Sequence, residues 1–183
     1  KLIFDYSTYY YNSHFTEYDC NNKAFEVNLR QPLNKNLKVE ASYTYTLSKA
    51  KGYDEPGETK QNSDDSDGSF EDDSFLVRAL WELPDYKKHK HSIDAKIEFG
   101  KRYFTSEKSV IMDPLHAGRF DNNMRLSGTY SFDISKSLTL SVFYNWFGRN
   151  ASSVSEENRE YISGEKDYKQ SQTGLSLNYR LKL

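Results

Sequence analysis

Gln172-Thr-Gly-Leu-Ser-Leu-Asn-Tyr-Arg-Leu-Lys-Leu183, the last twelve residues of the chain, alternates between apolar and polar side chains. Successive side chains of a β-strand point to opposite faces, so this alternation predicts a strand with one apolar face. That face carries Thr173, Leu175, Leu177, Tyr179, Leu181 and Leu183. The other face carries Gln172, Gly174, Ser176, Asn178, Arg180 and Lys182.

The composition is unusual for a packed soluble domain. Only 36% of residues are hydrophobic, mean hydropathy is −0.88 and 28% of residues are charged, which favours a poorly packed polar chain. Aromatic residues nevertheless make up 15% of the chain, and disordered chains are poor in them. A membrane β-barrel reconciles these facts, because only alternate strand residues must then be apolar.

The alternation of the last twelve residues recurs in seven earlier segments of the chain. They cover residues 2–12, 24–31, 37–48, 74–83, 91–104, 119–133 and 137–148. Most are close to the roughly 9 to 11 residues that a tilted membrane strand needs. No run approaches the ~18 consecutive apolar residues of a membrane helix. We therefore expect eight strands and a single domain over residues 1–183.

The connections between these segments alternate in length. Those at 32–36, 84–90 and 134–136 are short, and those at 13–23, 49–73, 105–118 and 151–167 are long. Four long loops on one side and three short turns on the other are typical of membrane barrels. The sequence thus predicts an all-β, antiparallel up-and-down transmembrane β-barrel, with its first and last strands paired and both termini on the short-turn side. We also expect either that a leader has been removed before Lys1 or that a larger segment lies upstream.

Charged side chains lie on the strand faces opposite the apolar ones. In hydrocarbon each would cost roughly 2 to 4 kcal/mol near the midplane, so they must face inward. We expect them to pair across the lumen and plug it, because an eight-stranded barrel is just wide enough to be filled by side chains. The principal members of this expected network are Glu40, Arg78, Glu82, Asp94, Glu98, Arg102, Arg125 and Arg180.

The final strand also carries a signature. Gln172, Gly174, Leu177 and Tyr179 match the assembly signal in the terminal strand of bacterial outer-membrane β-barrel proteins. The chain resembles the small eight-stranded OmpA-type members in strand count and loop pattern. This resemblance implies an outer-membrane location with extracellular long loops and periplasmic termini. It also implies contact with outer-membrane lipid and with the barrel assembly machinery.

The leading functional hypothesis is a membrane anchor, structural or interactive, that presents its loops to a protein partner. The runner-up is the carboxy-terminal part of a larger barrel that forms a pore or export channel. For that alternative, the run Arg119-Phe-Asp121 with Tyr130, Leu138, Leu140, Tyr144, Tyr168 and Gly174 is similar to closing hairpins of barrels in surface-export and polysaccharide-export proteins. A net charge of −2 and a pI near 6.1 give no electrostatic case for nucleic acid.

The connection at 49–73 concentrates carboxylates together with Gly57 and Gly68, so it is expected to carry recognition by attracting cations or a basic partner. Calcium prefers oxygen ligands from flexible loops, which makes Asp64, Asp65, Asp67 and Glu71 candidate ligands. The competing interpretation is a solvated acidic loop without a metal. No other cofactor is expected.

Enzymatic activity is a minor alternative, in the form of a lipid-modifying enzyme at the barrel rim. His89, His91 and Ser92 fall at the short-turn end, which is the wrong leaflet for that chemistry. His116 lies on the loop side, with Asp113 and Ser109 nearby in sequence, but nothing in the sequence orients it as a base. The basic cluster Lys87-Lys-His-Lys90 is interpreted as a solvated turn, with anionic lipid head groups as the alternative contact. We therefore expect no catalytic residues.

Overall fold

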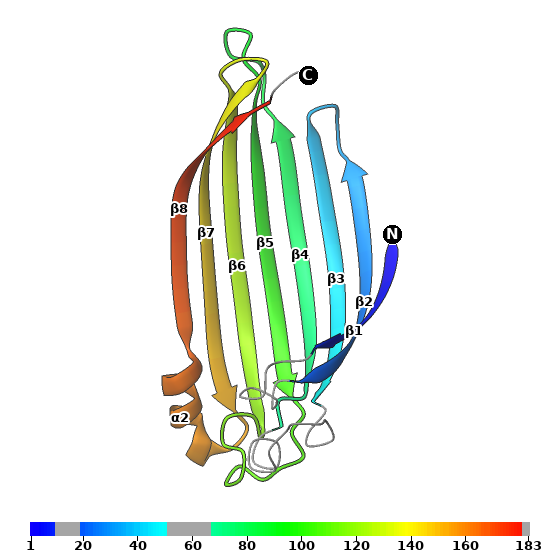
Figure 1. Ribbon diagram of the computed structural model, residues 1–183, viewed down its shortest axis with the longest axis vertical. Coiled ribbons are helices and arrows are strands. Elements are labelled where there is room, and N and C mark those ends of the chain that lie inside the picture. Colours follow the sequence, from blue (N-terminus) through cyan, green and yellow to red (C-terminus); the bar gives the residue numbers. More distant parts are fainter. Residues whose placement is uncertain (10–18, 51–66, 181–183) are drawn as a thin grey trace.

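The computed structural model describes residues 1–9, 19–50 and 67–180. They form one eight-stranded antiparallel sheet in which the strands follow one another in chain order (Figure 1). The strands are β1 (Leu2–Tyr9), β2 (Cys20–Pro32), β3 (Leu37–Ala50), β4 (Phe70–Glu82), β5 (His91–Phe104), β6 (Arg119–Asp133), β7 (Leu138–Ser153) and β8 (Tyr168–Tyr179). The all-β, antiparallel, up-and-down architecture predicted from the alternation is confirmed.

The predicted strand boundaries agree best where the alternation is longest. β5 and β6 begin and end at the expected residues, whereas β7 continues to Ser153 and β8 begins as early as Tyr168. Polar residues can occupy both faces where a strand extends past the apolar band, so the alternation fades there before the backbone pairing does. Residues 10–12 of the first predicted strand and 181–183 of the last lie outside the described residues.

The short turns and the long connections lie at opposite ends of the sheet, as expected (Figure 1). Local chemistry explains the first short turn, because the side-chain oxygen of Asn34 accepts hydrogen bonds from the backbone N–H groups of Asn36 (2.8 Å) and Leu37 (2.9 Å). An asparagine side chain that accepts hydrogen bonds from backbone N–H groups two and three residues later mimics a backbone turn, and here the next strand starts directly after it. We call the two ends of the sheet the short-turn end and the long-loop end.

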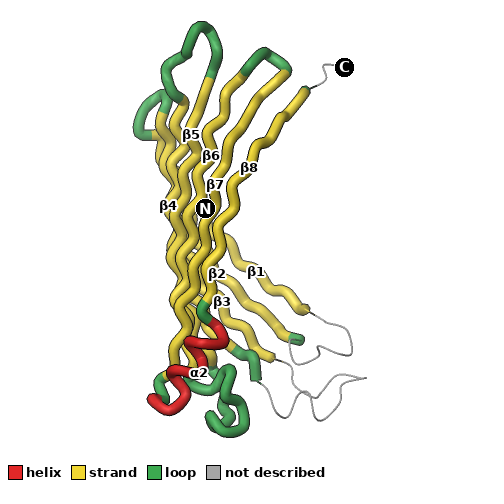
Figure 2. The backbone as a smooth tube through the Cα atoms, turned by 90° about the vertical axis from the view of Figure 1, so that its left-hand side faces the viewer, coloured by secondary structure: helices red, strands yellow, loops and turns green. Residues whose placement is uncertain are grey.

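The sheet is strongly curved but it is not a closed barrel (Figure 2). Among the described strands β8 pairs only with β7 and β1 pairs only with β2, so the expected pairing of the first and last strands is wrong. β1 also runs beside only part of β2, since its register begins with Leu2 opposite Val27. The edges of β8 and of the short-turn half of β2 consequently have no strand beside them in the described structure.

A helix in the last long connection was not expected from the sequence. α2 (Glu156–Lys166) packs against the long-loop half of β7 and buries Asn158 and Ile162. Its local signals are Ser155 at the N-cap position and two acidic residues in the first turn, which favour a helix start. α2 has only eleven residues, so its helical pattern was too short to be recognised in a sequence dominated by the two-residue alternation of strands.

Apolar burial by protein is confined to the long-loop end. Ala117, Ala151 and Ile162 are the buried apolar residues of the described chain. Large apolar side chains along the outward face of the strands, such as Phe4, Leu29 and Leu175, are exposed. The described residues contain no helix with the length and hydropathy needed to cross a membrane. This single-layered sheet therefore has an apolar face that no part of the described chain covers.

Candidate functional site on the concave face and its rim

The concave face of the sheet is polar and forms an open hollow towards the long-loop end. The hollow has a volume of about 500 Å³, and β1 through β7 all contribute residues to it. Its lining includes Asp5 of β1 and Arg149 of β7, near the two sides of the sheet. Because alternate residues share a face, the charged positions predicted to point inward lie together on this concave side.

Ion pairs run along the concave face between neighbouring positions. Arg78 Nε donates to Asp94 Oδ1 at 2.8 Å, and Arg102 Nε donates to Asp72 Oδ2 at 2.8 Å, both between β4 and β5. Other pairs on this face are Arg30–Glu40 (3.2 Å), Lys96–Glu98 (3.4 Å), Lys38–Glu82 (3.6 Å) and Arg125–Glu98 (3.9 Å). Each joins adjacent strands or positions within one strand, so the charges are neutralised along the wall.

Most residues of the expected lumen network thus form ion pairs, but these pairs run along the wall instead of across a lumen. Seven of the eight residues named from the sequence take part in these pairs, and Arg102 finds Asp72 instead of one of the carboxylates expected. Arg180 follows the end of β8, where its backbone N–H donates to Ser137, and its side chain is in none of the ion pairs of the described residues. The ion pairs found among the described residues run along the wall, and a lumen plugged by pairs across it stays a prediction.

The concave face changes character across the sheet. On β7 and β8 it carries mostly amides and rings, including Asn145, Gln170, Gln172, Phe143 and Phe147, with Arg149 as the charged residue at the long-loop end. The guanidinium of Arg125 lies 5.2 Å from the ring centre of Phe147, where the two kinds of surface meet. Apart from Arg149, the concave side of β7 and β8 named here is polar and uncharged.

The residues of the predicted assembly signal lie on β8. Gly174 is paired with Phe143, and a Cβ atom built on this glycine would lie 2.7 Å from Cε1 of that ring. The missing side chain thus leaves space for the ring to pack over the strand. Leu177 and Tyr179 face outward from the free edge strand and are 64% and 66% exposed. Gln172 belongs to the concave face beside Asn145.

Replacing Gly174 with alanine should destabilise β8 by about 1–3 kcal/mol, because the added methyl group forces the Phe143 ring from its place. The measurement is the urea midpoint of the folded chain in lipid bilayers. Gly128→Ala is the matched control, since its Cβ would meet no atom within 4 Å. The second change Phe143→Leu should restore part of the loss. Equal midpoints for the two alanine variants would contradict this account of the glycine.

A buried carboxylate organises the long-loop end. Asp113 is 2% exposed, and its Oδ2 accepts hydrogen bonds from the backbone N–H of Asp67 (2.9 Å) and from the hydroxyl of Ser106 (2.9 Å). Its Oδ1 lies 2.9 Å from Nδ1 of His116. Burial raises the pKa of Asp113, but the hydrogen bonds from His116, Asp67 and Ser106 outweigh it and hold this pKa below its usual value. Asp113 therefore fastens the connection before β4 to the connection after β5.

This geometry corrects the expectation that nothing orients His116, because Asp113 holds its ring. In a hydrolase triad the imidazole lies between the hydroxyl and the carboxylate. Here the carboxylate of Asp113 lies between the hydroxyl of Ser106 and the imidazole of His116. The arrangement fixes a loop, and the hydroxyl of Ser106 is not aligned for attack through His116. At the short-turn end, Nε2 of His91 is bonded to the Pro84 carbonyl oxygen at 2.7 Å.

Replacing Asp113 with asparagine should lower the free energy of local opening of residues 105–118 by about 1–3 kcal/mol, because buried donors lose their acceptor. Since the folded-state pKa is lowered, the stabilisation by Asp113 is complete above the ordinary value of 3.8 and is lost as the pH falls below it. The protection factors of this segment, which correct the exchange rates for the intrinsic pH dependence of the amides, should therefore fall on acidification in the unmodified chain and much less in Asp113→Asn. Ser109→Ala is the control in the same loop. An unchanged pH profile in Asp113→Asn would contradict this role.

The calcium hypothesis remains a prediction. Asp64 and Asp65 lie outside the described residues. The carboxylate of Asp67 accepts hydrogen bonds from the backbone N–H groups of Ser69 (3.0 Å) and Glu107 (3.4 Å), and Glu71 shares the outward face with Tyr103. Within residues 1–9, 19–50 and 67–180 no three His, Cys, Asp or Glu side chains are grouped to hold a metal ion.

Comparison with known protein families, with curated proteins and with solved structures finds no match. The function of this chain must therefore be argued from the geometry of its two faces, its edges and its rim.

Sequence reasoning missed one buried ion pair at the rim. Arg119 donates to Asp121 through both Nε (2.7 Å) and Nη2 (2.5 Å), and its guanidinium lies 4.4 Å from the ring centre of Phe104. Its Nη1 also reaches the carbonyl oxygen of Leu115 at 3.2 Å. The sequence did contain a signal for this pair: Arg119 and Asp121 have opposite charges and are two residues apart, which places both on the same face of a strand.

Proposed function

We propose that this chain forms a wall of a water-filled β-barrel pore in a bacterial outer membrane. The proposal rests on one observation: a single-layered sheet has one apolar face and one charged face, and among the described residues its first and last strands are unpaired on their outer sides. The convex face is apolar and uncovered, the concave face is charged, and neither β1 nor β8 has an outer neighbour in the described structure.

The apolar convex face supports lipid as its surroundings. Soluble monomers rarely expose continuous apolar surface beyond a few hundred Å². Here outward side chains such as Phe75, Trp81, Phe99, Tyr144 and Leu177 are each more than two-fifths exposed, and together they come from four strands, β4, β5, β7 and β8. A bilayer would bury them while every interior strand satisfies its backbone hydrogen bonds within the sheet. The free edges of β1, of β8 and of the short-turn half of β2 are the exceptions.

The free edges support a barrel larger than eight strands. In lipid an unpaired backbone group costs several kcal/mol, so both edges require partner strands. Barrel diameter grows with strand number, and barrels much larger than eight strands enclose an aqueous channel. The concave ion pairs agree with this proposal, because they neutralise charge along the wall and leave the middle open. Passage of polar solutes through the lumen is then the proposed activity, and β8 would carry the signal read by the barrel assembly machinery.

A second candidate is the eight-stranded anchor whose long loops bind a partner. One observation favours it: the hollow at the long-loop end is lined by residues from β1 through β7, so the sheet curls furthest there. The anchor would require β1 and β8 to come together in the bilayer and the concave charges to fill the lumen. The two candidates differ in whether water and ions pass.

Planar-bilayer conductance of the protein extracted from its native membrane separates the two candidates. The pore should give stable open-channel currents, and Glu98→Gln should shift their cation preference because this carboxylate lies on the concave wall. Glu165→Gln, on α2 at the rim, is the control and should leave that preference largely unchanged. A correctly folded protein that passes no current would reject the pore and favour the anchor.

A further inference from the structure

The three short turns repeat one pattern of side chains. They contain Leu33-Asn-Lys35, Tyr86-Lys-Lys88 and Ile134-Ser-Lys136. The apolar members Leu33, Tyr86 and Ile134 are 60%, 57% and 42% exposed, and an exposed lysine follows each of them after two residues. We call these three turns the basic rim. Nothing in the proposed pore activity requires this repetition.

Charge is distributed unevenly between the two ends of the chain. The turns at 33–36, 83–90 and 134–137 hold five lysines and one acid, Asp85. The connection at 49–73 on the opposite side is dominated by carboxylates in the sequence. The basic rim therefore presents a local positive surface although the whole chain has a net charge of −2.

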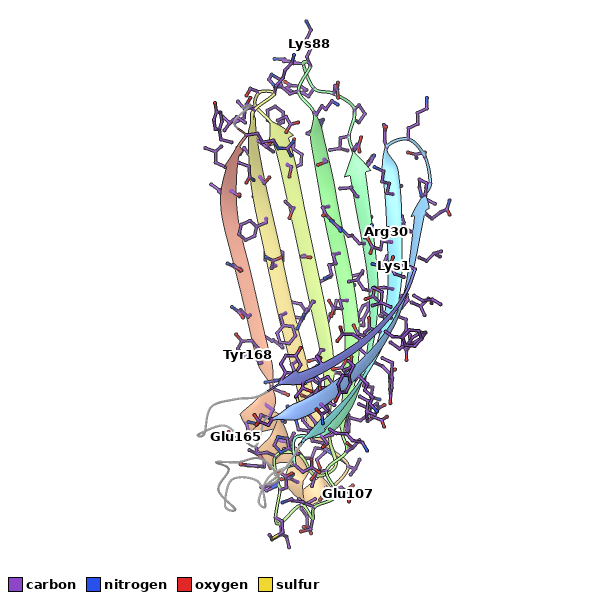
Figure 3. All side chains as sticks on the ribbon, turned by 45° about the vertical axis from the view of Figure 1, so that its right-hand side comes forward. Lys1, Arg30, Lys88, Glu107, Glu165 and Tyr168 are labelled. Atoms are coloured by element: carbon purple, nitrogen blue, oxygen red, sulfur yellow. The ribbon has the colours of Figure 1, made fainter. Side chains whose placement is uncertain are left out.

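The middle turn is held in a conformation that lysine rarely adopts. Lys87 and Lys88 have φ values of 49° and 73°, in the left-handed region that costs roughly 1–2 kcal/mol per residue. Reciprocal backbone hydrogen bonds between Tyr86 and His89 (3.0 and 2.8 Å) close this turn. Its position is fixed by His89, whose Nδ1 lies 2.8 Å from the carbonyl oxygen of Asp133. Lys88 consequently projects from the tip of the sheet (Figure 3).

We propose that the basic rim binds the headgroups of anionic phospholipids in the periplasmic leaflet, an inference that rests on the proposed outer-membrane pore with its short turns on the periplasmic side. The exposed apolar residue of each turn would enter the acyl boundary, and the lysine two residues later would contact phosphate. An acidic protein partner would need the lysines but not an apolar residue in every turn. The outward face next to the rim ends in aromatic side chains such as Trp81, which suit the same boundary.

The test uses quenching of Trp81 by brominated lipids in vesicles of phosphatidylcholine with a minor fraction of phosphatidylglycerol. The chain contains two tryptophans, so Trp146→Phe leaves Trp81, near the rim, as the only reporter. Bromine on phosphatidylglycerol should quench it about three- to five-fold more per lipid than bromine on phosphatidylcholine, as expected for lysines worth about 1 kcal/mol each at the surface. The triple variant Lys35→Gln, Lys88→Gln, Lys136→Gln should lose this preference, and high salt should weaken it.

The control removes three lysines from the other end, through Lys49→Gln, Lys166→Gln and Lys169→Gln, and should keep the preference. Equal quenching by the two lipids in the unmodified chain would overturn the proposal, and so would a preference that survives the rim triple variant. Binding of soluble polyglutamate without lipid preference would overturn it in favour of an acidic protein partner. Failure of brominated phosphatidylcholine to quench any tryptophan would instead show that the chain is not inserted, which rejects the membrane proposal itself.

Discussion

Replacing Val77 with arginine is expected to destabilise the chain strongly in lipid bilayers, whereas the same change at the adjacent Leu76 is expected to be tolerated. Val77 lies in the middle of β4 on the convex face, between Ala41 of β3 and Ile97 of β5. Arginine near the bilayer midplane costs about 2–4 kcal/mol on a lipid-facing strand position. A loss of that size is a large part of the stability of most folded domains.

Leu76 provides the matched control because it belongs to the same strand and points to the opposite face. It is paired with Glu98 of β5, a carboxylate that can accept the new guanidinium. Chemical unfolding in bilayers gives the comparison, with Val77→Arg expected about 2–4 kcal/mol below Leu76→Arg. Equal stabilities, or a larger loss at Leu76, would show that the convex face does not contact lipid.

The fold was largely predictable from the sequence because one physical rule governs most of it. Where the two faces of a sheet meet different surroundings, the strands show a regular alternation of apolar and polar side chains. β5 and β6 carry it over their full length and were predicted to the residue. α2 has no such constraint, and its short pattern gave only a weak helix signal.

Closure was predicted wrongly for a different reason. Alternation determines which residues belong to a strand and which face they occupy, but not which strand lies beyond an edge. Strand count and the terminal sequence of β8 suggested an eight-stranded barrel. The curvature of the sheet and the half-length pairing of β1 are properties of the assembled backbone, and they leave both edges open.

The sequence predicted which face of the sheet carries the charged residues of the candidate site, but not which residues they contact. Arg102 was correctly placed on the polar side, yet its partner Asp72 depends on the register between β4 and β5. Asp113 could be seen in the sequence only as a loop residue near His116. Its role depends on a hydrogen bond from Asp67, 46 positions away, and irregular connections carry no periodic signal of such contacts.

Thiol labelling along β5 tests the central claim, that the concave face lines water and the convex face contacts lipid. The chain contains one cysteine, Cys20, so a Cys20→Ser background permits single cysteines to be placed at successive positions from Ile93 to Phe99. A membrane-impermeant reagent is applied to the protein in its native membrane. Both faces are sampled by one strand whose neighbours β4 and β6 are paired along this whole segment.

We expect labelling with a period of two residues. Cysteines at Asp94, Lys96 and Glu98 should react because they face the aqueous lumen, and those at Ile93, Ala95, Ile97 and Phe99 should be protected by lipid. Protection at all seven positions would indicate a filled lumen and the eight-stranded anchor. Labelling without alternation, or with the two sets of positions exchanged, would contradict the assignment of the faces on which this account depends.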